Sequence, residues 1–146
     1  MKFKTLYFLL IVVFLNNINA QNKSKKEKIG SVGGYEMGYI DCIKKGNSYT
    51  ISYENQNEVQ VNGYSDFSIK LEEFENVYNT IITGFEKKQK SEISIPTVLN
   101  YVELDYTKFL GKMRVRFVQS KKKGALGVSF SAWYSLKQIK KLFGKL

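Results

Sequence analysis

The stretch from Val102 to Phe117 reads VELDYTKFLGKMRVRF, and it decides the fold. Apolar residues alternate with charged ones on both sides of a four-residue segment, 108–111, which ends in glycine. Such alternation is typical of strands with one face in the core, because successive side chains of a strand point to opposite faces. The pattern predicts an antiparallel hairpin with 108–111 as its loop. In the predicted register Tyr106 faces Met113, Leu104 faces Val115 and Val102 faces Phe117.

The other face of this hairpin would carry opposite charges. In the same register Asp105 faces Arg114 and Glu103 faces Arg116. Directly opposed opposite charges contribute about 0.2–1 kcal/mol per pair, and a shift by one residue would turn them into the core. Glu103 and Asp105 also have the spacing of a carboxylate pair for acid–base catalysis. Arginines across from both would hold them ionised, whereas a general acid must keep its proton, so we interpret them as part of a charge ladder.

The chain after the hairpin predicts one more strand and a helix. Residues 126–132 alternate again, and residues 120–125, SKKKGA, would form the loop that leads to them. Ser135 and Gln138 have the spacing of a capping box, which predicts a helix that ends near Gly144. The apolar face of this helix would dock on the sheet and consists of Leu136, Ile139, Leu142 and Phe143.

The chain before the hairpin predicts strands followed by a longer helix. Residues 37–44 and 48–54 are strand candidates, and residues 67–71 alternate into a helix over 71–88 with an apolar stripe at helical spacing. Acidic residues crowd the first turn of this helix and lysines its end, which matches the helix dipole. We therefore predict one α+β domain over 35–146. Its antiparallel sheet would have about five to seven strands, with the central and C-terminal helices packed on one face.

The N-terminus has the order of a secretory signal peptide. Lys2 and Lys4 precede an apolar run from Leu6 to Leu15, and a polar stretch then ends at Ala20. A run of this length is too short for a membrane span, which needs about 20 residues. We expect cleavage after residue 20, a flexible leader over 21–34, and a protein that is soluble in the periplasm or outside the cell without a transmembrane anchor.

The residue types present restrict the chemistry. The chain has no histidine, which excludes histidine-based catalytic triads and metal sites, and Cys42 has no second cysteine to pair with. We expect this cysteine to be buried and inert. No motif for a catalytic site, a metal or a cofactor is recognisable, so the sequence favours a non-catalytic protein and predicts no cofactor.

The charges are distributed unevenly along the chain. Residues 106–146 contain 11 basic and no acidic residues, whereas residues 21–105 contain 10 basic and 13 acidic ones. This asymmetry favours an anionic partner, such as an envelope component, a polysaccharide or an acidic protein. Residues 123–130 match an RNA-binding strand motif without its stacking aromatics at 125 and 127, which argues against nucleic acid. The candidate contacts are Lys121, Lys122 and Lys123 in the loop, and Lys137, Lys140 and Lys141 on the last helix.

Two hypotheses for the function follow from these observations. The first is an exported, envelope-associated binding protein that meets an anionic surface through its basic C-terminal part. The alternative is a small-ligand carrier or an enzyme with a pocket between sheet and helices, lined by Tyr49, Tyr53 and Tyr64. Trp133, the single tryptophan, would either stack on a sugar or lipid headgroup or anchor the core.

Overall fold

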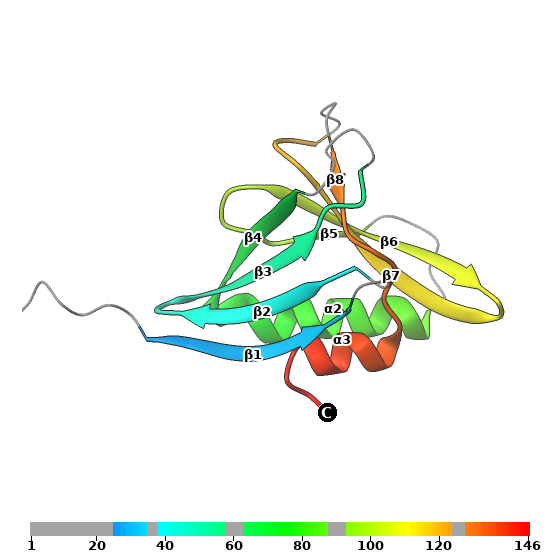
Figure 1. Ribbon diagram of the computed structural model, residues 1–146, viewed down its shortest axis with the longest axis horizontal. Coiled ribbons are helices and arrows are strands. Elements are labelled where there is room, and N and C mark those ends of the chain that lie inside the picture. Colours follow the sequence, from blue (N-terminus) through cyan, green and yellow to red (C-terminus); the bar gives the residue numbers. More distant parts are fainter. Residues whose placement is uncertain (1–24, 35–37, 58–62, 88–92, 124–127) are drawn as a thin grey trace, which may run out of the picture.

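Two antiparallel sheets and two α-helices make up the fold in the computed structural model (Figure 1). The structure describes residues 25–34, 38–57, 63–87, 93–123 and 128–146, so the predicted signal peptide at 1–20 lies outside the described residues. Within those ranges, no helix is long and apolar enough to span a bilayer.

The first half of the described chain is a four-stranded meander followed by a helix. Its strands hydrogen-bond in the order in which they follow one another along the chain. A short 3₁₀ turn, η2 (Leu71–Glu73), leads into the helix α2 (Phe74–Glu86). The four strands are β1 (Lys26–Val32), β2 (Ile40–Lys45), β3 (Ser48–Glu54) and β4 (Tyr64–Lys70).

The second half repeats this order. Its four strands again form a meander, and the helix α3 (Leu136–Leu142) follows, opened by the predicted capping box of Ser135 and Gln138. The strands are β5 (Ile93–Ile95), β6 (Tyr101–Phe109), β7 (Lys112–Ser120) and β8 (Ser129–Phe130). The α+β class with a central and a C-terminal helix is confirmed, and the described strands divide into two sheets of four where one sheet was expected.

Each helix packs against the sheet of the other half and also contacts its own half, α3 at β7 and α2 through the stack of Phe74 on Tyr49. The helix α2 lies against β6 and β7, and the most extensive strand contact of α3 is with β1 (Figure 1). Two glycines permit this close approach. A Cβ at Gly84 of α2 would collide with the Tyr106 ring, and a Cβ at Gly30 of β1 would collide with the backbone carbonyl of Lys141. The two halves are therefore interlocked and share one core.

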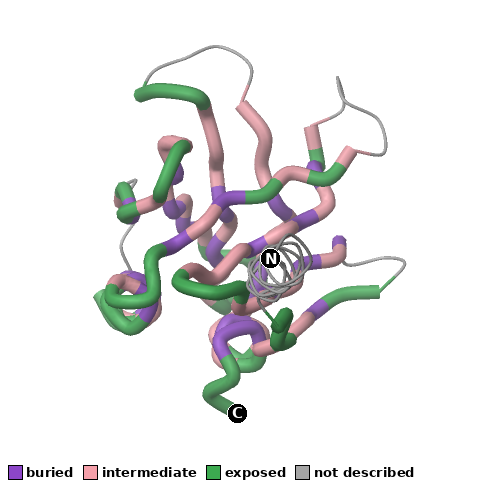
Figure 2. The backbone as a smooth tube through the Cα atoms, turned by 90° about the vertical axis from the view of Figure 1, so that its left-hand side faces the viewer, coloured by how far each residue is buried: buried purple, intermediate pink, exposed green. Residues whose placement is uncertain are grey.

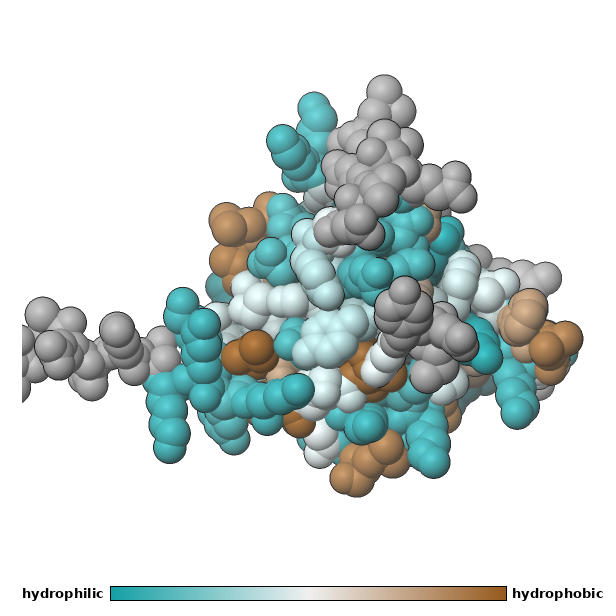
Figure 3. Space-filling model, viewed as in Figure 1, coloured by the Kyte–Doolittle hydropathy of each residue, from teal (hydrophilic) through white to brown (hydrophobic). Residues whose placement is uncertain are grey.

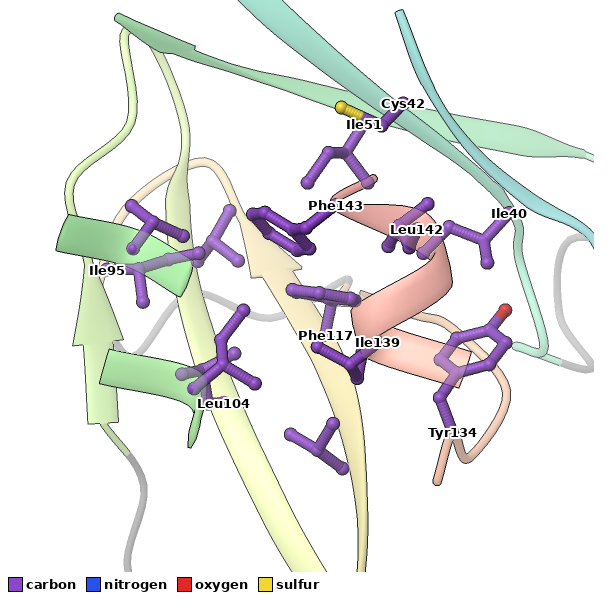
Figure 4. Close-up of a cluster of buried hydrophobic side chains, with 14 of the residues drawn as sticks. Ile40, Cys42, Ile51, Ile95, Leu104, Phe117, Tyr134, Ile139, Leu142 and Phe143 are labelled. Carbon is purple, nitrogen blue, oxygen red and sulfur yellow. The ribbon is translucent and has the colours of Figure 1, made fainter. Parts of the chain in front are cut away.

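The core lies between the sheets and the helices, where the buried positions gather in Figure 2. Phe67 of β4 and Phe117 of β7 join the two sheets, with ring centroids 5.4 Å apart. Phe74 and Phe143 join the two helices at 5.0 Å. In Figure 4 the side chains of α3 and its C-terminal end point to both sheets: Ile139, Leu142 and Phe143 lie among Ile40, Cys42, Ile51 and Phe117.

The prediction of a flexible leader over 21–34 was wrong for Lys26–Val32, which is β1. This strand pairs with β2, where Val32 lies opposite Ile40 and Gly30 opposite Cys42. Its own sequence buries little, because most of its side chains are charged or small. Ile29 packs against the core and lies beside Gly144, so the strand is held by β2 and by the end of α3.

The hairpin of β6 and β7 forms as predicted, but its predicted register was wrong by two residues. Tyr106 lies opposite Val115, and Asp105 lies opposite Arg116. The reason is the turn, which consists of Leu110 and Gly111 alone, with φ of 48° and 79°. Positive φ at both central residues is the signature of a type I′ turn, which fits the twist of a hairpin better than the four-residue loop that we expected. A shift by two keeps every side chain on its predicted face and changes its partner.

Candidate functional site

The corrected register leaves Arg114 without a carboxylate across the hairpin. Arg114 lies opposite Thr107, and it is Arg116 that forms the ion pair with Asp105. The Arg114 Nη1 atom donates a hydrogen bond of 3.4 Å to the carbonyl of Trp133, while its Nε is buried and unbonded. Among the described residues no acidic side chain pairs with Arg114, so its positive charge is available to a partner.

This guanidinium lies in a groove on the outer face of the second sheet. The groove has a volume of about 440 Å³ and is lined by Thr107, Phe109, Arg114 and Trp133. The Phe109 ring forms one wall, with its centroid 5.8 Å from the Arg114 Cζ, and is 57% exposed. An aromatic wall lowers the local dielectric, which strengthens the attraction between the guanidinium and a bound anion. The groove is suited to an anionic group carried on a partly apolar molecule.

Arg116 holds the second aromatic wall in place. Its Nε and Nη2 atoms each lie 2.9 Å from Asp105 Oδ2, and both side chains are 27% exposed. Its Cζ lies 4.8 Å from the ring centroid of Phe130 and 4.5 Å from that of Trp133. Each such cation–π contact contributes about 0.5–1 kcal/mol at an exposed site. Arg116 is therefore a structural cation with a partner, in contrast to Arg114.

The backbone explains why Trp133 faces outward. Val115 and Tyr134 exchange two hydrogen bonds, of 2.9 and 2.8 Å, which attach the chain before α3 to the edge of β7. Tyr134 is fully buried and points into the core. Because neighbouring side chains of an extended segment point to opposite faces, Trp133 lies on the outer face beside Arg116. Of the two roles considered for Trp133, the core anchor belongs to Tyr134.

The six predicted lysine contacts do not form one surface. The lysines at 121–123 are exposed where the chain leaves β7, at the far end of that strand from Arg114. On α3, Lys137 and Lys141 are exposed and Lys140 is half-buried. Figure 1 shows the end of β7 near β8 at the top of the molecule and α3 at the bottom. No single flat surface contacts both groups.

The three tyrosines considered as pocket residues also lie apart. Tyr49 stacks on Phe74, with ring centroids 3.7 Å apart. Tyr53 is fully buried, its hydroxyl lies 3.1 Å from Gln119 and 3.0 Å from Ser129, and burial raises its pKa to about 12. Tyr64 is 66% exposed and lies on the opposite side of the sheet. These rings line no common cavity.

The structure gives Cys42 no reactive character. The residue is fully buried in β2, as predicted, and burial raises the pKa of its thiol to about 12. The thiol therefore stays protonated at neutral pH, and a protonated thiol is a poor nucleophile.

A second surface cavity, of about 480 Å³, lies over β4 and mixes charges of both signs, Asp66, Lys70 and Glu72, with the apolar Leu99.

Comparison of the sequence with protein-family models, with curated proteins and with solved structures finds no match. Sequence reasoning missed Arg114, because the predicted register had assigned it to Asp105. The signal that would have found it is the turn: with Leu110 and Gly111 as the two turn residues, Arg116 falls opposite Asp105.

Proposed function

We propose that this chain is an exported, non-catalytic binding protein that contacts an anionic partner through its C-terminal half, at the groove around Arg114. The observation that carries the proposal is the Arg114 guanidinium, which lies in an aromatic groove with no acidic partner among the described residues. The proposed export rests on the signal-peptide pattern of residues 1–20.

The chemistry of the groove supports an anion as the ligand. A guanidinium is planar and presents several N–H donors in a fixed geometry that matches the oxygens of a carboxylate or a phosphate. The Arg114 side chain donates one hydrogen bond, from Nη1 to the Trp133 carbonyl, and pairs with no acidic side chain among the described residues. The absence of acidic residues from 106 to 146 gives this segment a positive field, which speeds the approach of an anionic partner.

A non-catalytic role is supported by the state of the groups that are usually reactive. The chain has no histidine, and Cys42 is buried and protonated. Burial also raises the pKa of the Tyr106 and Tyr134 hydroxyls well above the usual tyrosine range. These tyrosines are therefore neutral core residues at physiological pH and not general bases.

A binding experiment that compares two charge-removing variants tests the proposal. The chain from Gln21 onward is titrated with dextran sulfate, a soluble polyanion, and with vesicles that contain phosphatidylglycerol, each at rising salt. We compare R114Q, which removes one charge from the groove, with K121Q/K122Q/K123Q, which removes three from the loop favoured by the sequence. The groove predicts the larger loss of affinity for R114Q, about tenfold for a charge-assisted bidentate contact.

The two sites give opposite results in this experiment. If the triple lysine variant loses more affinity and R114Q binds as the unmodified chain does, the loop is the contact and the groove is not. If the unmodified chain binds neither probe, the proposed function is wrong as a whole. Thermal unfolding of R114Q serves as the folding control.

A further inference from the structure

The tip of the β6–β7 hairpin exposes two large apolar side chains between two lysines. We define the hairpin tip as residues 108–112, KFLGK. Phe109 is 57% exposed and Leu110 is 86% exposed, and both flanking lysines are exposed as well. In Figure 3 an apolar patch lies at the end of this hairpin, beside a hydrophilic group. The hairpin tip thus exposes two apolar side chains, Phe109 and Leu110, which are flanked by the positively charged Lys108 and Lys112.

Leu110 is unfavourable to folding in two respects. Its φ of 48° lies in the left-handed region, which costs about 1 kcal/mol for a residue with a Cβ and which asparagine and glycine tolerate better. Its side chain gains almost no burial in return. Strain of this kind at an exposed position points to a function, because neither packing nor turn geometry favours leucine there.

The hairpin tip is continuous with the groove. Phe109 belongs to both, and Arg114 lies beside its ring. The apolar side chains of Phe109 and Leu110 therefore have three basic residues around them: Lys108, Lys112 and Arg114. The nearest acidic residue along the chain, Asp105, forms an ion pair with Arg116. A surface that accepts this end of the molecule must offer negative charge around an apolar interior.

We propose that the hairpin tip inserts Phe109 and Leu110 into the interfacial layer of an anionic lipid bilayer, with Lys108, Lys112 and Arg114 contacting the lipid phosphates. This inference rests on the proposed function and names its partner. Apolar side chains at the tip of a loop bury in the boundary between headgroups and acyl chains, and nearby basic residues add electrostatic attraction to anionic lipids. Lysines on both sides of the tip reach the headgroups while their methylene stems stay near the apolar layer.

Other anionic partners would match the exposed apolar side chains and the basic residues of the hairpin tip less well than a bilayer. A polysaccharide or another hydrophilic polyanion offers nothing apolar to cover Leu110. A stable protein interface buries about 800 Å² on each partner, whereas the exposed apolar part of the hairpin tip is two side chains. A bilayer supplies both the charge and the apolar layer within the reach of one turn.

The first test compares L110N with the unmodified chain on three probes. These are vesicles of phosphatidylcholine with phosphatidylglycerol, vesicles of phosphatidylcholine alone, and dextran sulfate. Asparagine suits the turn, so the hairpin stays folded and thermal stability is unchanged or higher. We expect L110N to lose about tenfold in partition to the anionic vesicles, since burying one leucine accounts for such a factor, and to keep its affinity for dextran sulfate. Equal partition of the two proteins to anionic vesicles overturns the inference.

The second test reports the depth of the hairpin tip. A polarity-sensitive fluorophore is attached to L110C, and a matched control carries it on N79C, an exposed position of α2. Cys42 is buried and protonated, so labelling at neutral pH is confined to the introduced thiol. We expect the emission at 110 to shift to the blue with anionic vesicles and the emission at 79 to stay unchanged. No shift at 110, or the same shift at both positions, overturns the inference.

These outcomes separate the inference from the proposed function. A chain that binds dextran sulfate and ignores vesicles supports the anion-binding groove and overturns membrane insertion. A chain that binds neither overturns both.

Discussion

The two halves of this protein have the same order of elements, four strands and then a helix, and they differ in what their sheets do outside the core. The strands β1 to β4 have six or seven residues, whereas β6 and β7 have nine each. The longer hairpin extends past the core and ends in the hairpin tip (Figure 1). The first half carries charges of both signs throughout, whereas the second half has acidic residues only at Glu103 and Asp105 from 93 onward, and residues 106–146 carry only positive charges. The shared part of the two halves builds the core, and the difference between them marks the site.

The largest expected effect comes from disrupting the close packing of each helix on the other half. We expect G84A and G30A each to destabilise the protein by about 2–3 kcal/mol, because overpacking at a closed contact costs this much. The Tyr106 ring cannot move away from Gly84 freely, since its hydroxyl donates to the Ile81 carbonyl at 2.9 Å. Urea unfolding followed by circular dichroism measures the loss.

Gly34 provides the matched control for these two variants. It lies beyond β1 with nothing within 4 Å of the position of a Cβ. G34A should unfold within about 0.5 kcal/mol of the unmodified protein. A comparable loss in all three variants would show that the effect comes from replacing glycine and not from the packing of the helices.

Alkaline pH should weaken the first half through Cys42. Its thiol has a pKa of about 12 in the folded protein and an ordinary value of 9.0 when unfolded. The folded state therefore keeps a proton that the unfolded state loses, and stability falls as the pH rises above 9 toward 12. Between pH 8 and pH 10 we expect a loss of about 1–2 kcal/mol. In C42A this slope should flatten to the part contributed by the buried tyrosines Tyr53, Tyr106 and Tyr134, whose pKa values burial also raises, and an unchanged slope in C42A would assign all of it to other groups.

The register of the second half can be tested by removing its carboxylates one at a time. In the structure Asp105 binds Arg116, while Glu103 lies opposite Val118. We expect D105N to lose about 0.5–1 kcal/mol of stability and E103Q to lose almost nothing. The register predicted from the sequence pairs both carboxylates with arginines, so equal losses in the two variants would favour it.

The sequence was informative where a structure depends on local pattern. Alternation predicted the faces of β6 and β7, and the capping box predicted the first turn of α3. It was uninformative where distant segments decide. The charged strand β1 is held by β2 and by the end of α3, which no local pattern reveals. The division of the strands into two sheets depends on pairings of the same kind.

The candidate site was missed for a related reason. Counting charges along the sequence led us to favour the lysines at 121–123 as contacts. Such a count does not show which charges lie beside an aromatic groove in the folded protein. The groove depends on one turn: a two-residue turn at Leu110 moves Arg116 to Asp105 and leaves Arg114 with Phe109 and Trp133. The alternating pattern determined the face of the sheet on which each arginine lies. The turn determined which arginine has no carboxylate partner across the hairpin.

Equal removal of charge from the two halves tests the central claim most directly. The variant K112Q/R114Q removes two charges beside the groove, and K26Q/K45Q removes two from exposed, directly opposed residues of β1 and β2. Partition to phosphatidylglycerol vesicles is measured for both at physiological salt. A basic residue near an anionic membrane contributes about 1 kcal/mol, so we predict a loss of about 30-fold for K112Q/R114Q and less than about threefold for K26Q/K45Q. Equal losses would contradict the account, because they would show that net charge, and not the end of the β6–β7 hairpin, determines binding.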